Sequence, residues 1–402
     1  MRNSDFKMSL DRQISELTSV VQSSRDGIDD TTRFKAIKAA QGLLAALGSP
    51  AETVIQDVVL NSVLLMALRM GVQLDVFKTI RDSQSHVTTT QQIADKSGAS
   101  VVLVDQIMRL LAASGYVLED DVQSYKPSPL TMVMAEPTFE ATTRACFDIG
   151  NFCTTRAPEF FRNNSNQFPK SAKDTPFQLA MNTELSYFEW LGHNPELAKD
   201  FQQWMTLKQQ TTPNWADWFD IKHSITDGFN DSANNVLLVD IGGGEGHYLH
   251  ALNEKVPSLP GRLVLQDLPH VVSSIKNPPK GTDLMPHDFF TPQPVRGARA
   301  YYLHWILHDW ADEQARHILS NIVEAMEPGY SRLIINEYII PDRQCDFPTA
   351  CMSIMMMIQV GAFERSEKQW RELLNSVGLD KIVFHQPPSG GEGIIEAIKS
   401  PN

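Results

Sequence analysis

Residues 236–246 place the strongest single constraint on the fold. They read Val-Leu-Leu-Val-Asp-Ile-Gly-Gly-Gly-Glu-Gly, an apolar, β-branched run of strand length that ends in an acid and then breaks into glycines. A helical pattern of apolar residues follows at Tyr248, Leu249 and Leu252. The segment predicts a strand, a tight turn that lets a ligand approach the backbone, and a helix whose N-terminal amides face that ligand.

Downstream of this turn, strand-like and helix-like patterns alternate, which predicts an α/β fold with a mostly parallel sheet covered on both faces. The expected strands are 236–241, 262–266, 283–287, 299–304, 332–337, 380–386 and 393–398, with helices at 246–255, 269–276, 312–326 and 367–376. Ligands of such sheets bind at the carboxyl ends of the strands, where the glycine turn lies.

The chain before this unit is predicted to be helical. Residues 8–24 and 34–47 carry apolar stripes at helical spacing, and residues 51–80 are apolar almost all round. So much apolar surface needs burial on several sides, which indicates a subunit interface; a self-contained helical cap on one monomer is the alternative. We therefore divide the chain into residues 1–135, a helical dimerisation and winged-helix-like domain, 136–230, a helical linker and substrate-pocket segment, and 231–402, the ligand-binding domain.

The winged-helix shape is predicted from residues 87–126, which read as helix, turn, helix and two short strands. Such a shape ordinarily suggests DNA binding. Here the second helix offers one base, Arg109, and the ribbon carries Glu119, Asp120 and Asp121. Without an array of basic residues for phosphate contacts, we expect a structural module that binds no nucleic acid.

The overall charge agrees with this expectation. Lys and Arg number 35 against 48 Asp and Glu, a formal charge of −13, which disfavours nonspecific binding to nucleic acid or anionic membrane. No apolar run reaches the roughly 18–20 residues of a membrane span, and the N-terminus lacks a signal-peptide core. The four cysteines show no zinc spacing, so no metal is expected, and a cytoplasmic location is the default.

The glycine turn does not fit a dinucleotide site. Gly242 and Gly244 have the right spacing for the first two glycines, but His247 and Leu249 stand where the third is needed. Asp267, at the end of the next strand, is placed to bind both ribose hydroxyls or to cap the helix that begins at Pro269.

Further acids and a histidine follow later strands. Asp288 and Phe289 are placed to hydrogen-bond and cover an adenine. His308 and Asp309 lie just beyond the strand 299–304; an imidazole of pKa near 6.5 can accept a proton from a bound hydroxyl at neutral pH. Glu337 and Glu364 come at later strand or loop ends. Each acid alone reads as a solvated carboxylate or local salt bridge, but the set indicates a site.

These motifs, in order Asp-x-Gly-Gly-Gly-x-Gly, Asp-Leu-Pro-His, His-Asp-Phe-Phe, His-Asp-Trp, Asn-Glu and Glu-Arg-Ser, resemble those of the S-adenosylmethionine-dependent O-methyltransferases of the caffeic-acid and isoflavone type, in their fungal secondary-metabolism branch. The resemblance covers about residues 55–400. It implies a Rossmann-like class I methyltransferase domain with a mostly parallel seven-stranded sheet, a homodimer with interleaved N-terminal helices, and S-adenosylmethionine as cofactor, released as S-adenosylhomocysteine.

The resemblance also implies roles for individual residues. The implied cofactor-binding residues are Asp240, Gly242, Gly244, Asp267, Leu268, Asp288, Phe289 and His304, the last standing where plant relatives usually have Lys. The implied catalytic residues are His308 as general base, Glu337 and Glu364 bracketing its imidazole, and Asp309. The implied acceptor-binding residues are Phe201, Met205, Trp305, Met355 and Gln359. His308 would take the proton of the acceptor hydroxyl, whose oxygen attacks the sulfonium methyl in line.

Two other functions stay open at this point. Some fungal members of the superfamily resemble pericyclases, which hold the cofactor as a charged structural group and catalyse dehydration or cycloaddition. A non-enzymatic regulator using the winged helix is the second alternative. The methionines at 355–357 and the aromatic residues of 184–218 suggest an apolar pocket for an aromatic or polyketide-like acceptor, although both groups equally suit core packing.

Overall fold

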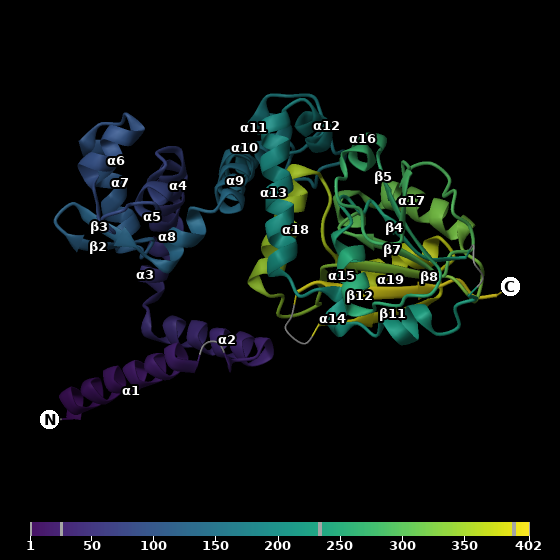
Figure 1. Cartoon of the computed structure of the whole chain (residues 1–402), viewed down its shortest axis with the longest axis horizontal. Helices are drawn as coiled ribbons and strands as arrows, with labels where there is room; N and C mark the ends of the chain where they lie inside the picture. Colours follow the sequence, from purple (N-terminus) through teal and green to yellow (C-terminus); the bar gives the residue numbers. More distant parts are fainter. Residues whose placement is uncertain (1, 25–26, 232–234, 388–390, 402) are drawn as a thin grey trace. The chain divides into compact units, whose positions relative to one another are not determined.

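The structure is a computed structural model that describes residues 2–24, 27–231, 235–387 and 391–401. The chain divides into two compact units, one ending at Asn61 and the other beginning at Ser62. Figure 1 draws the helices and strands of both units, with colours that follow the sequence.

The first unit is entirely helical. Its elements are α1 (Arg2–Ser24), α2 (Asp30–Leu47), α3 (Pro50–Ile55) and the π-helical turn η2 (Gln56–Leu60). Asp29 caps α2 by accepting the Thr32 N–H at 2.9 Å. The apolar stripes stay uncovered within the described residues, with Leu44 69% and Val58 71% exposed. The predicted helices are therefore present, and many of their described apolar side chains are exposed.

Helix Pro50–Gln73 corrects one expectation from the sequence. It is 24 residues long with a mean hydropathy of 1.5 and has 6% of its apolar window buried, so by length and composition it could cross a membrane. The expectation that no segment qualifies was wrong because scattered polar residues such as Gln56 and Asn61 interrupt the run without lowering its mean hydropathy enough. Such a helix is equally suited to a protein interface. The cytoplasmic location stays a prediction.

The predicted winged helix begins after this apolar segment. Helix α4 (Asn61–Gln73) ends before Asp75, whose φ is 55°, and α5 (Val76–Arg81) follows. The predicted helix 51–80 is therefore interrupted rather than continuous. Helices α6 (Thr90–Ser97) and α7 (Val101–Ala113) precede the ribbon β2 (Val117–Asp121) and β3 (Ser124–Pro127), which pairs with β1 (Thr88–Thr89). Ile93, Ala94 and Val104 are buried, as their spacing predicts.

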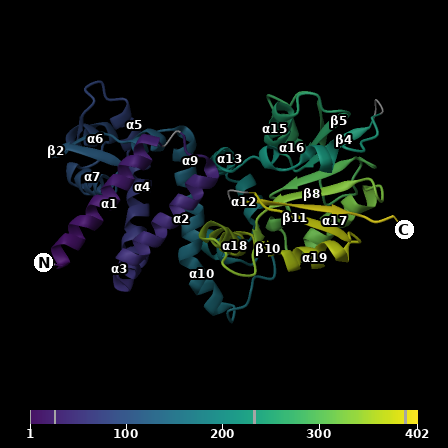
Figure 2. The same ribbon diagram turned by 90° about the horizontal axis from the view of Figure 1, so that it is seen from below.

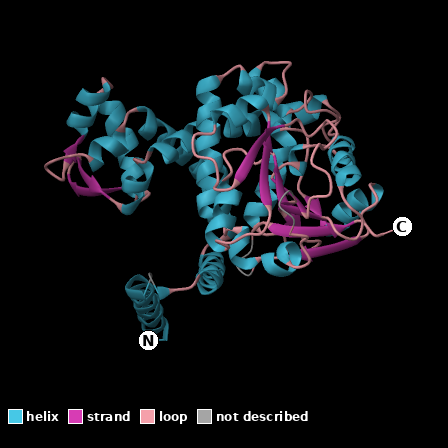
Figure 3. Ribbon diagram, turned by 45° about the vertical axis from the view of Figure 1, so that its right-hand side comes forward, coloured by secondary structure: helices cyan, strands magenta, loops and turns pink. Residues whose placement is uncertain are grey.

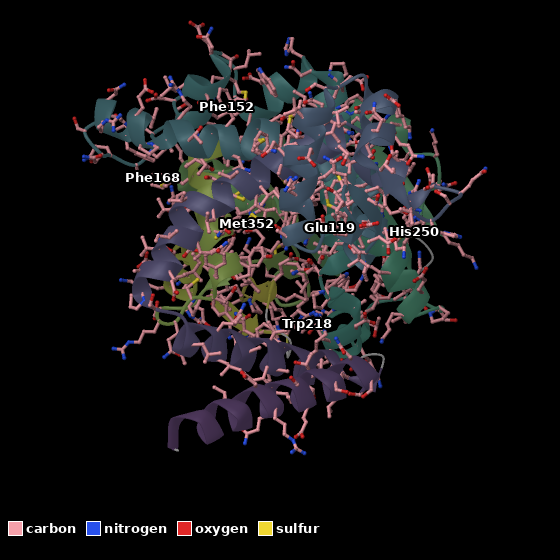
Figure 4. The ribbon with its side chains drawn as sticks, turned by 90° about the vertical axis from the view of Figure 1, so that its left-hand side faces the viewer. Glu119, Phe152, Phe168, Trp218, His250 and Met352 are labelled. Atoms are coloured by element: carbon pink, nitrogen blue, oxygen red, sulfur yellow. The ribbon has the colours of Figure 1, made fainter. Side chains whose placement is uncertain are left out.

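A helical segment leads from the winged helix to the large sheet. Its helices are α8 (Pro129–Met134), α9 (Pro137–Ala145), η3 (Cys146–Asn151), α10 (Phe152–Asn163), α11 (Pro176–Met181), α12 (Tyr187–Gly192), α13 (Pro195–Thr211), α14 (Trp215–Trp218) and η4 (Lys222–Thr226). Helices α9, η3 and α10 follow one another without a gap from Pro137 to Asn163. Helices α9 and α13 are joined by a bidentate pair in which Arg144 donates to Asp200 at 2.7 Å. Some apolar side chains remain at the surface, among them Phe152 at 47% and Phe168 at 43% exposure (Figure 4).

The predicted α/β fold is confirmed by a seven-stranded sheet in the order β11-β12-β8-β7-β4-β5-β6. Its strands are β4 (Val236–Ile241), β5 (Arg262–Asp267), β6 (Thr282–Pro286), β7 (Ala300–His304), β8 (Arg332–Glu337), β11 (Lys381–His385) and β12 (Gly393–Ile398). Strand β12 runs antiparallel to both neighbours and the other pairings are parallel. All seven were predicted to within about two residues.

Helices cover both faces of this sheet (Figures 1 and 2). On one face α17 (Asp312–Ala325) and α19 (Glu367–Ser376) bury Leu319 and Trp370 against strand residues such as Val239. On the other, α14 and α15 (His247–Lys255) bury Trp215 and Leu252 against the alternate strand positions. Helix α16 (Pro269–Ser274) follows β5. This alternation places the carboxyl ends of β4, β5, β7 and β8 at one edge.

Several of the described elements escaped sequence prediction, among them α18, β9 and β10. Helix α18 (Phe347–Gln359) contains three consecutive methionines, which give no helical period. Strands β9 (Ile339–Ile340) and β10 (Arg365–Ser366) pair in parallel with two residues each, too few for a pattern. Figure 3 shows the strands in magenta, and the 3-10 turn η5 (Leu307–Asp309) lies at the end of β7.

Candidate active site

The glycine turn joins β4 to α15 in the way the sequence predicts. Gly242, Gly244 and Gly246 have φ angles of 71°, 56° and 82°, in the left-handed region that favours glycine. The N–H of Gly242 donates to the carbonyl of Gln266 on β5 at 2.8 Å. A Cβ at Gly242 would lie 2.5 Å from Ile306 Cδ1, whereas at Gly244 it would meet nothing within 4 Å. The turn therefore leaves no room for a side chain at Gly242 but has open space beside Gly244.

Asp267 ties this open glycine to the next strand. Its Oδ2 accepts the Gly244 N–H at 2.9 Å and its Oδ1 accepts the Leu268 N–H at 2.7 Å. Burial raises the pKa of Asp267, and the two N–H donors oppose that shift. Leu268 itself is the N-cap residue of α16, so the alternative role of Asp267 as the cap of that helix is wrong.

Asp240, the acid of β4, is a buried carboxylate near the end of that strand. The residue is 1% exposed, and among the described residues its Oδ2 has no hydrogen-bond partner. Burial, with the negative charge of Asp267 adding to it, raises the pKa of Asp240 to about 7. A buried carboxylate with an unpaired oxygen fits a ligand that brings positive charge, such as S-adenosylmethionine with its sulfonium and ammonium groups.

The predicted adenine loop follows β6. Asp288 is exposed and its Oδ1 accepts the Phe290 N–H at 3.0 Å, while Phe289 packs against Phe290 with ring centroids 5.1 Å apart. Two buried glutamines that the sequence did not reveal fix this loop to β5. Gln266 and Gln293 exchange two amide hydrogen bonds of 2.8 Å. The loop is therefore anchored at the edge that carries Asp267.

His304 ends β7 in a buried polar cluster. Its Nε2 lies 2.9 Å from the Tyr248 hydroxyl and 2.9 Å from Oε2 of Glu392. Burial lowers the pKa of His304, although Glu392 opposes the shift. Its ring also stacks on Trp305 at 4.9 Å. Glu392 and Tyr248 were not foreseen, because no local pattern links them to His304.

The backbone turns sharply at Trp305. Its φ of 52° is a left-handed conformation that costs a bulky residue free energy and persists only when neighbours hold it. Oε1 of Glu337 accepts the next two N–H groups, those of Ile306 at 3.1 Å and Leu307 at 2.7 Å. Burial raises the pKa of Glu337 to about 7, against the opposing effect of His308. Glu337 thus anchors the turn before His308, and these hydrogen bonds go to the backbone rather than to the imidazole that the resemblance implied.

His308 is buried directly after this turn. Its Nδ1 lies 2.7 Å from Oε1 of Glu364, and its Nε2 lies 3.7 Å from Oδ1 of Asp309. Burial pulls the pKa of His308 down, but the charges of Glu364, Asp309 and Glu337 together outweigh it and raise the pKa to about 10. Burial also raises the pKa of Asp309 to about 6. Without a ligand, the imidazole therefore carries a proton at neutral pH.

Arg365, which the sequence did not single out, holds η5 beside Glu364. The residue is 1% exposed, and its guanidinium donates to the carbonyls of Leu307 and Trp310 at 2.8 Å each and to Asp312 at 2.9 Å. Arg365 thus ties η5, which carries His308, to the segment that follows Glu364. The Glu-Arg-Ser motif was the available signal.

The predicted acceptor residues are less closely gathered. Phe201 packs on Tyr187 with ring centroids 5.6 Å apart, and Gln359 is 6% exposed. Met205 and Met355 are half-buried. A cavity of about 160 Å³ adjoins the site, lined by Thr206, Gln209, Thr212, Pro213, Asn214, His247 and Tyr248, and none of the five predicted residues lines it.

No group of three or more His, Cys, Asp or Glu side chains within the described ranges is arranged to hold a metal ion. One edge of the sheet carries a glycine turn, two strand-end acids and the buried His308–Glu364 pair. This arrangement is typical of a nucleotide-type cofactor site of the class I methyltransferase kind. Comparison with known proteins gives the family. The O-methyltransferase domain matches residues 162–380 and the O-methyltransferase dimerisation domain matches residues 57–136.

The chain belongs to the S-adenosylmethionine-dependent O-methyltransferase family. It is 36% identical over 340 residues to "O-methyltransferase asqD" of Emericella nidulans, which covers 84% of this chain and 87% of that protein. Its fold is similar to that of LepI solved in complex with S-adenosylmethionine, with a TM-score of 0.87, 31% identity and 96% and 99% coverage. A structure described as a pericyclic reaction enzyme matches with a TM-score of 0.86, 30% identity and 96% and 100% coverage. LepI has also been solved in complex with S-adenosylhomocysteine and a substrate analogue.

Proposed function

We propose that this enzyme transfers the methyl group of S-adenosylmethionine to a hydroxyl of an aromatic or polyketide-like small molecule, with His308 as general base. The observation that carries the proposal is the buried His308–Glu364 pair, 2.7 Å apart, at the sheet edge that also holds the glycine turn. A positioned histidine oriented by a carboxylate is what deprotonation of a hydroxyl requires.

The chain's residues would hold the cofactor along the strand ends. We assign the ribose to Asp267, with the Leu268 N–H beside it, the adenine to Asp288 and Phe289, and the positively charged end to Asp240. Gly242 and Gly244 line the approach and His304 closes it. The bound cofactor supplies a sulfonium methyl group that is already activated for transfer, so the remaining task of the protein is positioning and proton removal.

His308 must be neutral before it can accept a proton. Its pKa of about 10 in the ligand-free protein means that it starts charged. A cationic ligand nearby disfavours a second positive charge and lowers that pKa. Glu364 keeps the proton on Nδ1, so that Nε2 is the atom that faces the acceptor hydroxyl. Asp309, 3.7 Å from Nε2, then stabilises the imidazolium that forms.

Replacing His308 tests this proposal. His308→Ala should bind S-adenosylmethionine at least as tightly as the wild type by calorimetry, because no cofactor group is assigned to its ring and the variant lacks the imidazolium charge that opposes a cationic ligand. Its turnover should fall by about 10²–10⁴-fold, the usual contribution of a positioned base. Wild-type methylation by this variant, measured as S-adenosylhomocysteine release with a phenolic panel, would contradict the role of His308.

A second candidate function is a pericyclic or dehydration reaction in which the cofactor keeps its methyl. The similarity to a pericyclic reaction enzyme favours this function. The raised pKa of His308, about 10, favours it as well, since an imidazolium can act as a proton donor. Product mass separates the two functions: methylation adds one methylene unit to the acceptor, whereas the alternative leaves its mass unchanged or removes water.

We further propose that the enzyme acts as a homodimer. The support is the dimerisation domain at residues 57–136, which overlaps the exposed apolar helix Pro50–Gln73. The proposed partners are then a second copy of the chain and a small-molecule acceptor. Nucleic acid is not proposed, because the ribbon of the winged helix carries Glu119 and Asp121 on exposed positions.

A further inference from the structure

The indole of Trp305 carries a hydrogen-bond donor that has no acceptor in the described chain. Its Nε1 is shielded from solvent and has no hydrogen-bond partner among the described residues. An indole N–H can only donate, so no other hydrogen-bonding role is open to this atom. A donor that is withheld from water and left unpaired destabilises the folded protein, and a ligand that supplies an acceptor removes this cost.

The surroundings of Trp305 distinguish it from other tryptophans with an unpaired N–H. Trp215 and Trp370 also have an Nε1 without a partner in the described ranges, but they are 1% and 0% exposed inside the two cores that cover the sheet. Trp305 is half-buried and directly follows His304, the last residue of β7. It therefore lies at the edge where parallel strands present their carboxyl ends to a ligand.

Neighbouring groups fix the orientation of this indole. The ring stacks on His304 with centroids 4.9 Å apart, and it lies 6.4 Å from the ring of Tyr338, whose hydroxyl accepts from Nζ of Lys208 at 2.6 Å. The backbone at Trp305 has a φ of 52°, and Glu337 holds this turn by accepting the next two N–H groups. Strain of this kind concentrates at ligand sites, where one side chain must be held in one place.

The candidate base lies next to the same ring. The centroids of Trp305 and His308 are 5.8 Å apart. In the proposed function Nε2 of His308 accepts the proton of the acceptor hydroxyl. A group that accepts from the indole would then lie on the same ring system as that hydroxyl, a few bonds away. The indole N–H is a neutral donor, and a neutral carbonyl oxygen is the acceptor that matches it.

We infer that the indole N–H of Trp305 binds a carbonyl oxygen of the acceptor, so that the natural acceptor is an aromatic hydroxy ketone with its carbonyl on a carbon close to the hydroxyl that faces His308. The inference rests on the proposed function, because that function places the hydroxyl at His308. No bond is made or broken at Trp305.

The carbonyl also gives the indole a part in the deprotonation. When a hydroxyl conjugated to a carbonyl loses its proton, negative charge spreads from the hydroxyl oxygen onto the carbonyl oxygen. A positioned N–H at the carbonyl stabilises that charge as it develops, which makes the hydroxyl a stronger acid towards His308. The same N–H competes with the internal hydrogen bond between the hydroxyl and the carbonyl, so the hydroxyl is freed to donate to Nε2.

Binding of two probes of matched shape to the full-length enzyme tests the inference. One probe is a naphthol with an acetyl group on the carbon next to the hydroxyl, and the other carries an isopropyl group in place of the acetyl group. Calorimetry is carried out with saturating S-adenosylhomocysteine. The wild type should bind the acetyl probe roughly tenfold more tightly, the usual effect of one buried hydrogen bond.

Three variants assign this preference to the N–H. Trp305→Phe keeps an aromatic ring without the donor and should bind both probes equally. Trp305→His restores a ring N–H and should regain part of the preference. Trp218→Phe is the matched control, because Trp218 is also half-buried but packs against Phe219 on α14 (Figure 4), and it should leave the preference unchanged.

NMR of the wild type gives a second readout that is independent of affinity. The chain has seven tryptophans, and the Nε1–H signal of Trp305 is the one missing from Trp305→Phe. The acetyl probe should move this signal downfield, because the N–H enters a hydrogen bond, and the isopropyl probe should not.

Equal binding of the two probes by the wild type, a preserved preference in Trp305→Phe, or an indole signal that does not respond to the acetyl probe would overturn the inference. Neither readout needs methyl transfer. A preference that depends on Trp305, without methylation of any hydroxy ketone, would therefore count against the proposed function and leave the carbonyl site standing.

Discussion

At the scale of single residues, the site contains buried carboxylates that have too few hydrogen-bond partners. Asp240, Glu337 and Glu364 each have one carboxylate oxygen without a hydrogen bond among the described residues. Burial raises the pKa of Asp240 and of Glu337 to about 7. Unpaired buried carboxylates destabilise a folded protein, so the ligand-free enzyme keeps a cost that bound positive charge can offset.

Asp240→Asn makes this cost measurable through pH. A carboxyl whose folded pKa of about 7 exceeds its unfolded value of 3.8 stabilises the fold below pH 3.8, and that stability is lost as the pH rises towards 7. The ligand-free variant should therefore melt several degrees above the wild type at pH 8, with little difference near pH 4. Thermal melts across this range are the measurement. A difference independent of pH would show that Asp240 is not charged and buried as described.

The imidazole of His308 also makes the fold less stable as the pH rises, but here the cause is the charge of neighbouring carboxylates rather than burial. His308 has a folded pKa raised from 6.5 to about 10, so its contribution to stability is complete below pH 6.5 and is lost between about pH 6.5 and 10. Glu364→Gln removes the nearest cause of that shift. The pKa of His308, followed by NMR of its ring protons, should fall in this variant, and an unchanged value would assign the shift to Asp309 and Glu337 instead.

At the scale of elements, the glycine turn separates packing from ligand binding. Gly244→Ala adds a methyl group where nothing lies within 4 Å in the ligand-free protein, at a φ of 56°. We expect a loss of about 1–2 kcal/mol in stability from the left-handed backbone and at least a tenfold loss of S-adenosylmethionine affinity if the cofactor occupies that space. Denaturant unfolding and calorimetry give the two quantities.

Gly98→Ala is the control for this prediction. Gly98 ends α6 in the winged helix with a φ of 70° and also meets nothing within 4 Å, so it should cost similar stability and no cofactor affinity. Gly242→Ala should instead disrupt the turn, because its Cβ would lie 2.5 Å from Ile306 Cδ1. Equal cofactor affinity in Gly244→Ala and Gly98→Ala would contradict the placement of the cofactor at this turn.

Elements with a regular period were the part of the fold that the sequence could predict. The strands of the large sheet follow from local patterns of apolar residues. Strand-end residues such as Asp267 and His308 were predictable because parallel strands deliver their carboxyl ends to one edge. Lys208, Glu392 and Gln293 were not, since each acts on a side chain far away in sequence and has no local signature. Helix α18 was missed because its methionine run has no apolar period.

At the scale of the whole molecule, the exposed apolar helix Pro50–Gln73 is the surface that we propose for self-association. Val58 is 71% exposed, and the side chains around it, Val54, Ile55, Val59, Leu60 and Val63, are also exposed. An apolar surface this continuous needs a partner, and a second copy that buries the same helix would provide one.

Val58→Glu should therefore convert the dimer to monomers, because an unpaired carboxylate in an apolar interface costs several kcal/mol. Sedimentation velocity at micromolar concentration is the measurement. Val122→Glu is the control: Val122 is 83% exposed in the β2–β3 turn and should leave the dimer intact. A monomeric wild type that sediments with lipid vesicles would instead favour insertion of this helix into a membrane.

The two sides of the proposed cofactor site are held by contacts of very different separation along the chain. Gly244 reaches Asp267 across 23 residues, whereas His304 reaches Glu392 across 88. Closing a longer loop costs more entropy and comes later, so during folding the ribose side can assemble while the side at His304 still waits for β12. A refolding chain should thus gain adenosine affinity before it gains affinity for the full cofactor, and the order in which the two ligands bind reports how far the sheet has closed.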